Sequence, residues 1–325
     1  METKRNVVAE LKRLTGNRNI KWPSGIGLVR TSDGYGLHLS QSSTCGNMQS
    51  NASAFDGWAL ALKAWLSEDA CRTVEIKWDP PQDPCDRHYQ RLLYRIIRFR
   101  ASVSWLRVAA SAEKHLEESR VLFPNGDVKT RALYLNRPGN RPPKDTTPLP
   151  SEEKDWTEHG LELEFLKAKA LLSAIGWVGT VNRQLPVGVF KERVADDTYI
   201  FTGKKSAVDL WACDPNKKLL GLFELKRPGN SQVGAISELL FYSFVIRDLL
   251  DGVFSYETRS SKARESLNTE FLNSQGIGAF LLVRNLHPLL DRARLFTMLN
   301  RSLSSRGIHF GVLTYDGHLQ IKRVY

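Results

Sequence analysis

The spacing of apolar residues predicts alternating helices and strands in the first part of the chain. A helix opens the chain, and Ser32-Asp33-Gly34 is typical of the turn of a hairpin. Apolar residues at helical spacing run from Leu92 to Leu106 and predict a long helix there. The expected elements after the opening helix are a hairpin at 25–40, a helix at 54–67, a strand at 71–78 and a helix at 88–109. This set predicts an α+β domain.

The pattern of apolar and polar residues becomes more regular after residue 150. Short apolar runs bounded by turn residues alternate with stretches of helical spacing, and 277–285 is apolar for most of its length, as in a strand covered on both faces. The expected elements are a helix at 157–176 that ends at Gly176, a strand within 177–190, strands at 206–214 and 219–227, a helix at 232–250, a strand at 277–285, a helix at 289–304 and two strands around Asp316-Gly317. This order predicts an α/β sandwich built on a mixed sheet.

A proline-rich stretch separates the two parts. The sequence RPGNRPPKDTTPLP at 137–150 holds five prolines, which neither a helix interior nor a central strand accommodates. We therefore expect a first domain at 1–136, a linker at 137–150 and a second domain at 151–325.

Charge indicates what kind of partner the chain meets. Lys and Arg outnumber Asp and Glu by 46 to 35, for a net charge of +11, and most of this excess lies in residues 1–150. Such a balance favours a polyanion, either nucleic acid or an anionic membrane surface, although a merely basic protein has the same balance. The longest apolar run, at 239–246, is too short to span a bilayer, so we expect no membrane partner.

The start of the chain and its cysteines favour a cytoplasmic protein. The opening METKRNVVAELKR contains no apolar signal core, and the four cysteines show no Cys-x-x-Cys spacing. Free thiols in a reducing compartment are the expected state.

The candidate chemistry lies in GLFELKRPGN, at 221–230. Side chains alternate along a strand, so Glu224 and Lys226 point to one side of it, and Asp209 lies in the preceding strand. Two nearby carboxylates repel each other, and a hard divalent cation such as Mg²⁺ or Mn²⁺ would relieve the repulsion. A lysine beside a metal-bound water can position that water or stabilise charge on a phosphate. This set of groups is suited to metal-assisted phosphodiester hydrolysis.

The motif resembles that of the PD-(D/E)XK nuclease superfamily, whose members have the restriction-endonuclease-like fold. The resemblance rests on Asp209, a spacer of 14 residues, Glu224-Leu225-Lys226 and a following helix, and it covers 157–325. It implies a restriction-endonuclease-like α/β sandwich in the second domain. It also implies that the aspartate and the glutamate bind Mg²⁺ and that Lys226 is the catalytic lysine.

Further residues of that superfamily lie outside the strand pair, and the resemblance implies a place for them here. A glutamate of the preceding helix often joins the site; Glu164 is our choice because it shares a helical face with apolar residues, and Glu162 is the reserve. RecB-like members carry Gln-x-x-x-Tyr in the helix after the lysine, where this chain has Glu238 and Tyr242. The residue before the aspartate is Val208 and not proline.

Arginines provide candidate contacts to nucleic acid. Arg91, Arg95 and Arg98 form a second stripe on the helix expected at 88–109. That face either lies along phosphates or is an ordinary solvated face. Arg227, directly after the candidate catalytic lysine, is a further candidate contact.

A second Glu-x-Lys segment lies in the first domain. Glu75 and Lys77 belong to the strand expected at 71–78, and Gln90 and Tyr94 follow at a spacing similar to that of the first segment. An apparent helix precedes them, and not a strand with an aspartate. We therefore expect chance or a decayed internal repeat before a second active site.

The hypothesis that follows is a Mg²⁺-dependent DNA nuclease, with a basic first domain that holds the nucleic acid or senses a partner. The choice of DNA and a role in restriction or defence against foreign DNA rest on the resemblance. Three alternatives stay open: a nuclease directed at RNA, a non-catalytic nucleic-acid-binding module on the same fold, and a structural Glu224–Lys226 ion pair at a sheet edge. A homodimer is also left open.

Overall fold

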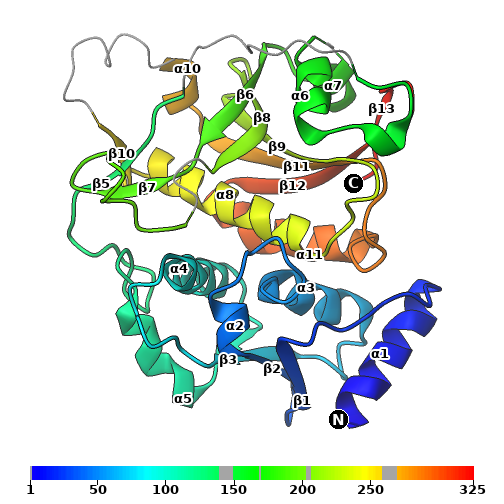
Figure 1. Ribbon diagram of the computed structural model, residues 1–325, viewed down its shortest axis with the longest axis vertical. Coiled ribbons are helices and arrows are strands. Elements are labelled where there is room, and N and C mark those ends of the chain that lie inside the picture. Colours follow the sequence, from blue (N-terminus) through cyan, green and yellow to red (C-terminus); the bar gives the residue numbers. More distant parts are fainter. Residues whose placement is uncertain (1, 139–148, 168–169, 203–205, 258–268) are drawn as a thin grey trace. The chain divides into compact units, whose positions relative to one another are not determined.

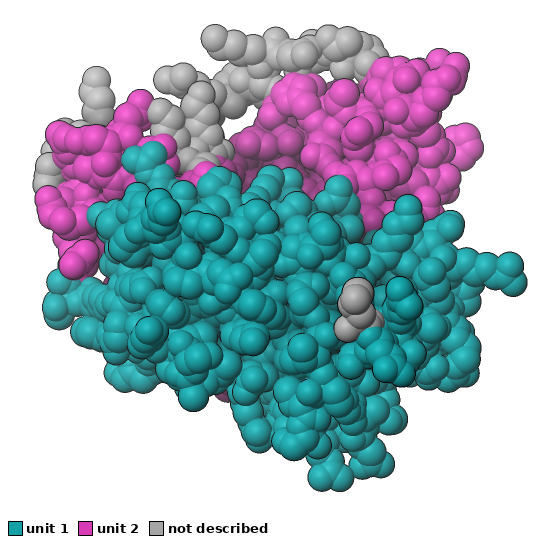
Figure 2. Space-filling view, turned by 60° about the horizontal axis from the view of Figure 1, so that its bottom comes forward, with its two compact units in different colours: residues 1–130, 232–238, 287–303 teal, residues 131–231, 239–286, 304–325 magenta. Residues whose placement is uncertain are grey.

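The structure, a computed structural model, describes residues 2–138, 149–167, 170–202, 206–257 and 269–325 (Figure 1). The chain divides into two compact units, which Figure 2 shows in separate colours. Unit 1 comprises Met1–Thr130, Gln232–Glu238 and His287–Leu303, and unit 2 comprises Arg131–Ser231, Leu239–Leu286 and Ser304–Tyr325. Most of the predicted linker at 137–150 lies outside the described residues, so that linker and the domain boundaries drawn from it stay predictions.

Unit 1 contains a four-stranded mixed sheet with helices between its strands. Its elements are α1 Glu2–Thr15, β1 Ile26–Arg30, β2 Gly34–Leu39, α2 Gln41–Thr44, α3 Phe55–Trp65, β3 Thr73–Trp78, α4 Arg87–Ser102, β4 Leu106–Val108, α5 Ala110–Glu113, the 3₁₀ helix η1 Lys114–Glu118 and α11 Ala293–Leu303. The strands lie in the order β1-β2-β3-β4, with β1 antiparallel to β2 and the later neighbours parallel. Parallel strands that alternate with helices form an α/β arrangement, and not the α+β arrangement predicted for this part of the chain.

The hairpin predicted at 25–40 is confirmed as β1 and β2. The Thr31 amide donates to the Gly34 carbonyl at 3.1 Å and closes the turn. A glycine is required at position 34, because a Cβ there would lie 1.8 Å from the carbonyl oxygen of Thr73 in the neighbouring strand. The first strand pair of unit 1 is therefore determined by local turn chemistry and by one close backbone approach.

The helix predicted at 88–109 ends seven residues early, as α4. Its start is capped by Asp86, whose side chain accepts the Tyr89 amide at 2.9 Å. Val103 has an extended backbone, with φ −125° and ψ 120°, and Leu106–Val108 then pairs with β3 as β4. The apolar spacing from Val103 onward thus belongs to a strand, and the prediction of a helix was wrong there because short apolar runs fit both periods.

Unit 2 contains a six-stranded mixed sheet in the order β13-β12-β11-β9-β8-β6 and a small sheet in the order β10-β5-β7. The elements are β5 Leu133–Leu135, η2 Glu153–Asp155, α6 Glu158–Lys167, α7 Ala170–Ile175, β6 Val181–Pro186, β7 Val189–Lys191, β8 Ala207–Asp214, β9 Leu219–Lys226, α8 Gly234–Leu250, β10 Ser255–Tyr256, α10 Thr269–Leu272, β11 Gly276–Val283, η3 Ser304–Arg306, β12 Ile308–Tyr315 and β13 Ile321–Arg323. The first turn of α8 is counted with unit 1. Strands β9, β11 and β12 are parallel, and β6, β8 and β13 are antiparallel to their neighbours. The predicted α/β class and mixed sheet are confirmed.

Helices cover the large sheet on both faces (Figure 1). One core cluster joins Leu161 and Phe165 of α6 and Leu171 of α7 to Phe223 and Leu225 of β9. Alternation along β9 then directs Glu224 and Lys226 to the other face. Figure 1 shows α8 on the opposite side of the sheet from α6 and α7. Within the described residues, no helix is both long enough and apolar enough to cross a membrane.

Candidate active site

Strands β8 and β9 are paired along only part of their length. Their antiparallel ladder ends at Leu210↔Phe223. Beyond that pair, β8 stays paired with β6 as far as Ala207, and β9 stays paired with β11 as far as Lys226. The two strands therefore part towards the end of β9, where the predicted acids and lysine lie.

Asp209 joins the two strands where their ladder ends. Its Oδ2 accepts a hydrogen bond from the backbone amide of Leu225 at 2.8 Å. The position of Asp209, one step beyond the last ladder pair, places it on the same face as Glu224, because side chains alternate in both strands. The sequence left the pairing register of the two strands open, and the structure places the two acids on one face.

Glu224 and Lys226 form a buried ion pair. Their residues are 2% and 5% exposed, and Glu224 Oε1 lies 2.5 Å from Lys226 Nζ. The backbone of Lys226 is held as well, because the Tyr315 hydroxyl donates to its carbonyl at 2.7 Å. Burial raises the pKa of Tyr315, so that hydroxyl keeps its proton and stays a donor. Lys226 is thus held at its ammonium group and at its backbone carbonyl.

The third acid predicted for the site does not join this pair. Glu164 forms an ion pair with Lys167 at 2.8 Å instead. The reserve residue, Glu162, is buried beside β6, where it accepts from Gln184 at 2.9 Å and pairs with Arg183 at 2.9 Å. Burial raises the pKa of Glu162. The reason for this correction is that α6 packs on the sheet face opposite to the acid–lysine pair.

Two residues near the end of β9 were missed by the sequence analysis. Glu158, in the first turn of α6, accepts a hydrogen bond from the side chain of Asn230 at 3.1 Å, four residues beyond Lys226. Tyr315 supports the lysine from β12. An acid in the first helical turn was a signal for Glu158. Tyr315 could not be found without the pairing of β9, β11 and β12.

The other candidate residues near the site differ in how far they are exposed to solvent. Arg227 is exposed, directly after β9, and remains available to a polyanion. Glu238 and Tyr242 of α8 are 3% and 4% exposed. Glu238 belongs to unit 1, where its carboxylate accepts from the side chain of Gln49. The two α8 residues are therefore parts of packed interiors.

The arginine stripe of α4 is buried, which corrects both expectations for it. Arg91, Arg95 and Arg98 are 4%, 2% and 6% exposed, so they form neither a solvated face nor a face along phosphates. Arg95 makes a bidentate ion pair with Asp56, at 2.7 and 3.1 Å. Arg98 donates to the carbonyl of Gly126 at 2.9 Å. Helical spacing shows which residues share a face but not what that face packs against.

The second Glu-x-Lys segment has different neighbours. Glu75 lies beside Gly36 and Arg107 in the sheet, and Lys77 lies beside His38. The amide of Gln90 is used inside unit 1; its nitrogen donates to two backbone carbonyls, and its oxygen accepts the amide of residue 120. The residue beside Glu75 in β4 is thus Arg107, whereas the β8 residue in line with Glu224, one step beyond the last ladder pair, is an acid, Asp209.

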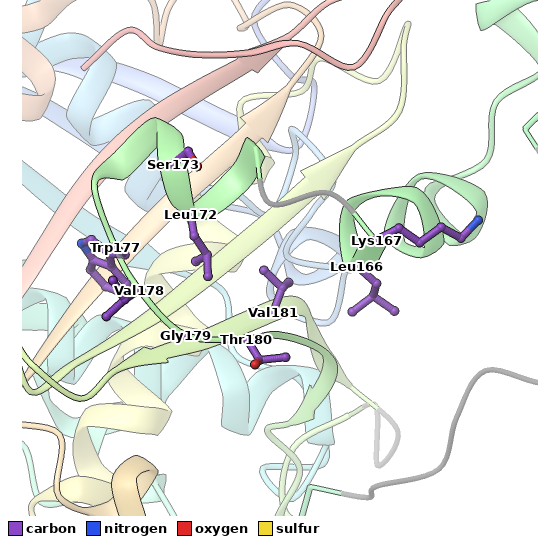
Figure 3. A pocket seen from close by; sticks show the side chains of 9 residues that line it. All are labelled: Leu166, Lys167, Leu172, Ser173, Trp177, Val178, Gly179, Thr180 and Val181. Atoms are coloured by element: carbon purple, nitrogen blue, oxygen red, sulfur yellow. The ribbon is translucent and has the colours of Figure 1, made fainter.

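Unit 2 has a pocket of about 440 Å³ that none of the candidate site residues lines (Figure 3). It extends from the end of α6 to the start of β6, and Figure 3 shows mostly apolar side chains around it. The Lys167 ammonium points away from these side chains. Among the residues that the structure describes, no three His, Cys, Asp or Glu side chains are grouped to hold a metal ion. The sequence-predicted residues that lie together in unit 2 are thus two acids and a lysine.

Comparison with known proteins adds no relative: no family model, no curated protein and no solved structure matches this chain. The candidate site is accordingly defined by its own geometry. Three features make up this geometry. They are the point where β8 and β9 stop pairing, the hydrogen bond that Asp209 accepts from the β9 backbone there, and the buried Glu224–Lys226 ion pair.

Proposed function

We propose that this chain is a nuclease that hydrolyses phosphodiester bonds with the help of Mg²⁺ or Mn²⁺. One observation carries the proposal: the Asp209 carboxylate contacts the backbone between Glu224 and Lys226, at the point where β8 and β9 part. An acid from one strand and an acid–lysine pair from the next thus meet at one end of the sheet. Paired acids beside a lysine are the groups that metal-assisted phosphodiester hydrolysis needs.

The donor set fits a hard divalent cation. Asp209 and Glu224 supply carboxylate oxygens, and Mg²⁺ commonly binds one or two carboxylates while water and substrate phosphates complete its shell. A carboxylate has about four acceptor positions, so a single hydrogen bond or ion pair does not exhaust it. The bound ion would neutralise phosphate charge and lower the pKa of a bound water.

Lys226 has the role that depends most on geometry. Glu224 holds its ammonium, and Tyr315 holds its backbone carbonyl. We assign the ammonium to orient the attacking water and to stabilise the negative charge that develops on the phosphate oxygens. The water oxygen forms a bond to phosphorus while the phosphorus–oxygen ester bond in line with it breaks. The attacking water releases a proton to solvent, and the leaving oxygen takes up a proton from solvent.

DNA is the substrate that we propose, with restriction or defence against foreign DNA as the role. Both follow from the resemblance of the strand motif to the PD-(D/E)XK superfamily. The net charge of +11 and the exposed Arg227 beside the site support a polyanionic substrate. RNA is the alternative substrate, and the cleavage experiment below includes it.

A non-catalytic binding module is the second candidate, and one observation favours it. Glu224 and Lys226 are nearly fully buried and already neutralise each other, as a purely structural ion pair would. The module would keep the fold and the positive charge but would not cleave its ligand.

Cleavage of labelled DNA and RNA by the full chain tests the proposal, with Mg²⁺, with Mn²⁺ and with EDTA. We expect metal-dependent products from DNA and a fall in rate of about 100-fold or more for Lys226→Ala. Lys77→Ala is the matched control, because it makes the same change in the Glu-x-Lys segment of β3, and we expect it to leave the rate unchanged.

Two outcomes would count against the assignment. Cleavage that Lys226→Ala leaves unchanged would contradict the site. Intact DNA in both metals, together with a gel shift that weakens with salt, would favour the binding module.

A further inference from the structure

Unit 1 contains a pocket of about 510 Å³ formed by α1, β2, the end of α3 and the residues around the start of α11. Pockets that bind small organic ligands have volumes of about 300–1,000 Å³. The lining residues that matter here are Glu10, Arg13, Tyr35, Trp65, Arg292 and Arg294. Three guanidinium groups and one carboxylate line the same pocket, which favours an anionic ligand.

Arg292 is the guanidinium whose position is best defined. It stacks on the ring of Trp65, 4.4 Å from the ring centroid, and the indole N–H is fixed by a 2.8 Å hydrogen bond to the carbonyl of Leu289. The Nε of Arg292 is buried and has no hydrogen-bond partner within the described part of the chain. A buried N–H without an acceptor is unfavourable, so an acceptor supplied by a ligand would stabilise this arrangement.

Other arginines stacked on aromatic rings have an acceptor within the protein. Arg95 lies over Phe55 and pairs with Asp56. Arg306 likewise stacks on a phenylalanine, and although its Nε also has no hydrogen-bond partner within the described part of the chain, its Nη2 pairs with an aspartate. Stacking alone therefore does not explain why Arg292 lacks an ion-pair partner among the described residues. The difference is that Arg292 lines a pocket.

Arg13 and Arg294 are held by contacts that a ligand can replace. Arg13 pairs with Glu10, and Arg294 pairs with Glu68, and all four side chains are largely exposed. Exposed ion pairs add little to stability. Either arginine can therefore turn towards an anion in the pocket at small cost.

We propose that this pocket binds a phosphate monoester, with Arg292 as its principal contact. Two phosphate oxygens match the planar fork of Nε and one Nη of a guanidinium. The nearly two negative charges of a phosphate monoester match the excess of guanidinium groups over carboxylates in the lining. The phosphate is carried either by a free nucleotide or by the end of a nucleic-acid strand.

The proposal is independent of the nuclease function, because binding is measured without metal and without cleavage. Isothermal titration calorimetry on the full chain in EDTA uses three probes: AMP, a short DNA strand with a 5′-phosphate, and the same strand with a 5′-hydroxyl. The first two probes distinguish the two sources of the phosphate. The third measures attraction to nucleic acid in general.

Three variants make the test specific. Arg292→Gln removes the cation, and Arg292→Lys keeps the charge but loses the fork. Arg100→Gln is the matched control, since Arg100 is another arginine of unit 1, pairs with Glu113 and does not line the pocket. We expect affinity for at least one phosphorylated probe to fall by about tenfold or more in Arg292→Gln, less in Arg292→Lys, and not in Arg100→Gln.

Three results would overturn the proposal. They are no binding of either phosphorylated probe to the wild type, an unchanged affinity in Arg292→Gln, and an equal loss for the 5′-hydroxyl strand. Thermal unfolding of each variant shows whether it is folded. If Arg292→Gln is not, Arg294→Gln changes a side chain of the same pocket that is 40% exposed, and it is judged by the same criteria.

Discussion

The two large sheets are built from the same order of elements along the chain. In unit 1 the antiparallel pair β1–β2 is followed by β3 and β4 in parallel, with α3 and α4 between the strands. Along the second half of the chain, the antiparallel pair β8–β9 is followed by β11 and β12 in parallel, with α8 and α11 between the strands. By this order β9 corresponds to β2, and β11 corresponds to β3.

The strand pairs differ at the end where the chemistry lies. The β1–β2 ladder pairs every residue of β1, up to Ile26 opposite Leu39. The β8–β9 ladder stops at Leu210, and Asp209 bonds across to the backbone of β9. The corresponding end of β2 carries the fully buried Leu39. Strands that part leave room for polar side chains between them, and strands that stay paired do not.

The comparison also explains the second Glu-x-Lys segment. Glu75 and Lys77 lie in β3, which has parallel neighbours on both sides and corresponds to β11, not to β9. The same three-residue pattern thus occurs at two different positions of a similar sheet. A pattern in one strand predicts a site only together with the strand beside it.

The largest expected effect comes from changing the glutamate in each of the two Glu-x-Lys segments. Glu224→Gln keeps the shape of the side chain and removes its charge, so we expect the rate of DNA cleavage in Mg²⁺ to fall by about 100- to 1,000-fold. Glu75→Gln makes the same change in β3, and we expect no change in rate. Initial rates on labelled DNA measure both. A loss in Glu75→Gln alone would transfer the assignment to unit 1.

The next largest effect concerns the buried ion pair of unit 1. Asp56 and Arg95 are 1% and 2% exposed, and Asp56→Ala would leave the arginine buried without its partner. We expect a loss of about 3–5 kcal/mol in the free energy of urea unfolding. Asp69→Ala removes the exposed pair with Arg72 and should cost less than about 1 kcal/mol. Equal costs for the two variants would show that burial is not what makes the first pair important.

Acid sensitivity offers a third comparison between the units. Burial lowers the pKa of His287, in unit 1, from 6.5 to about 4, and its Nδ1 accepts the amide of Leu289 at 3.1 Å, which requires a neutral ring nitrogen. The unfolded chain takes up the proton first, so this stability is complete above pH 6.5 and is lost as the pH falls towards 4. The ceiling for this loss is about 3 kcal/mol.

The measurement is the free energy of unfolding between pH 7 and pH 4. We expect His287→Asn to flatten the curve, because asparagine can accept the same amide without titrating in this range. His318→Asn, at an exposed position of unit 2, should leave the slope nearly unchanged. Identical slopes for the wild type and His287→Asn would contradict the assignment.

Local features were predictable from the sequence, and features that depend on pairing were not. The turn at Ser32-Asp33-Gly34 and the strands that became β3, β8 and β9 follow from short apolar runs between turn residues. Asp209 and Glu224 could be placed on adjacent strands because the connection between these strands is short. The register that puts both acids on one face depends on pairing and came from the structure.

The third acid and the arginine stripe needed information that the sequence does not hold. Glu164 was chosen from its helical face, but the register of α6 on the sheet decides which face that is. Arg95 was assigned to a surface, although Asp56, 39 residues earlier, neutralises it in the interior. A charged stripe can be buried when its partners come from elsewhere in the chain, and such partners have no local signal.

The smallest expected effect separates the two roles of Asp209, as a bridge between strands and as a candidate metal ligand. Asp209→Asn keeps an acceptor for the Leu225 amide, so we expect its unfolding free energy to stay within about 0.5 kcal/mol of the wild type, whereas Asp209→Ala should lose about 1 kcal/mol. Both should lose cleavage. Urea unfolding and cleavage rates of the two variants provide the test. Equal instability of Asn and Ala would mean that charge, and not the hydrogen bond, holds β9 to β8, and the contrast with the fully paired β1–β2 would then be electrostatic.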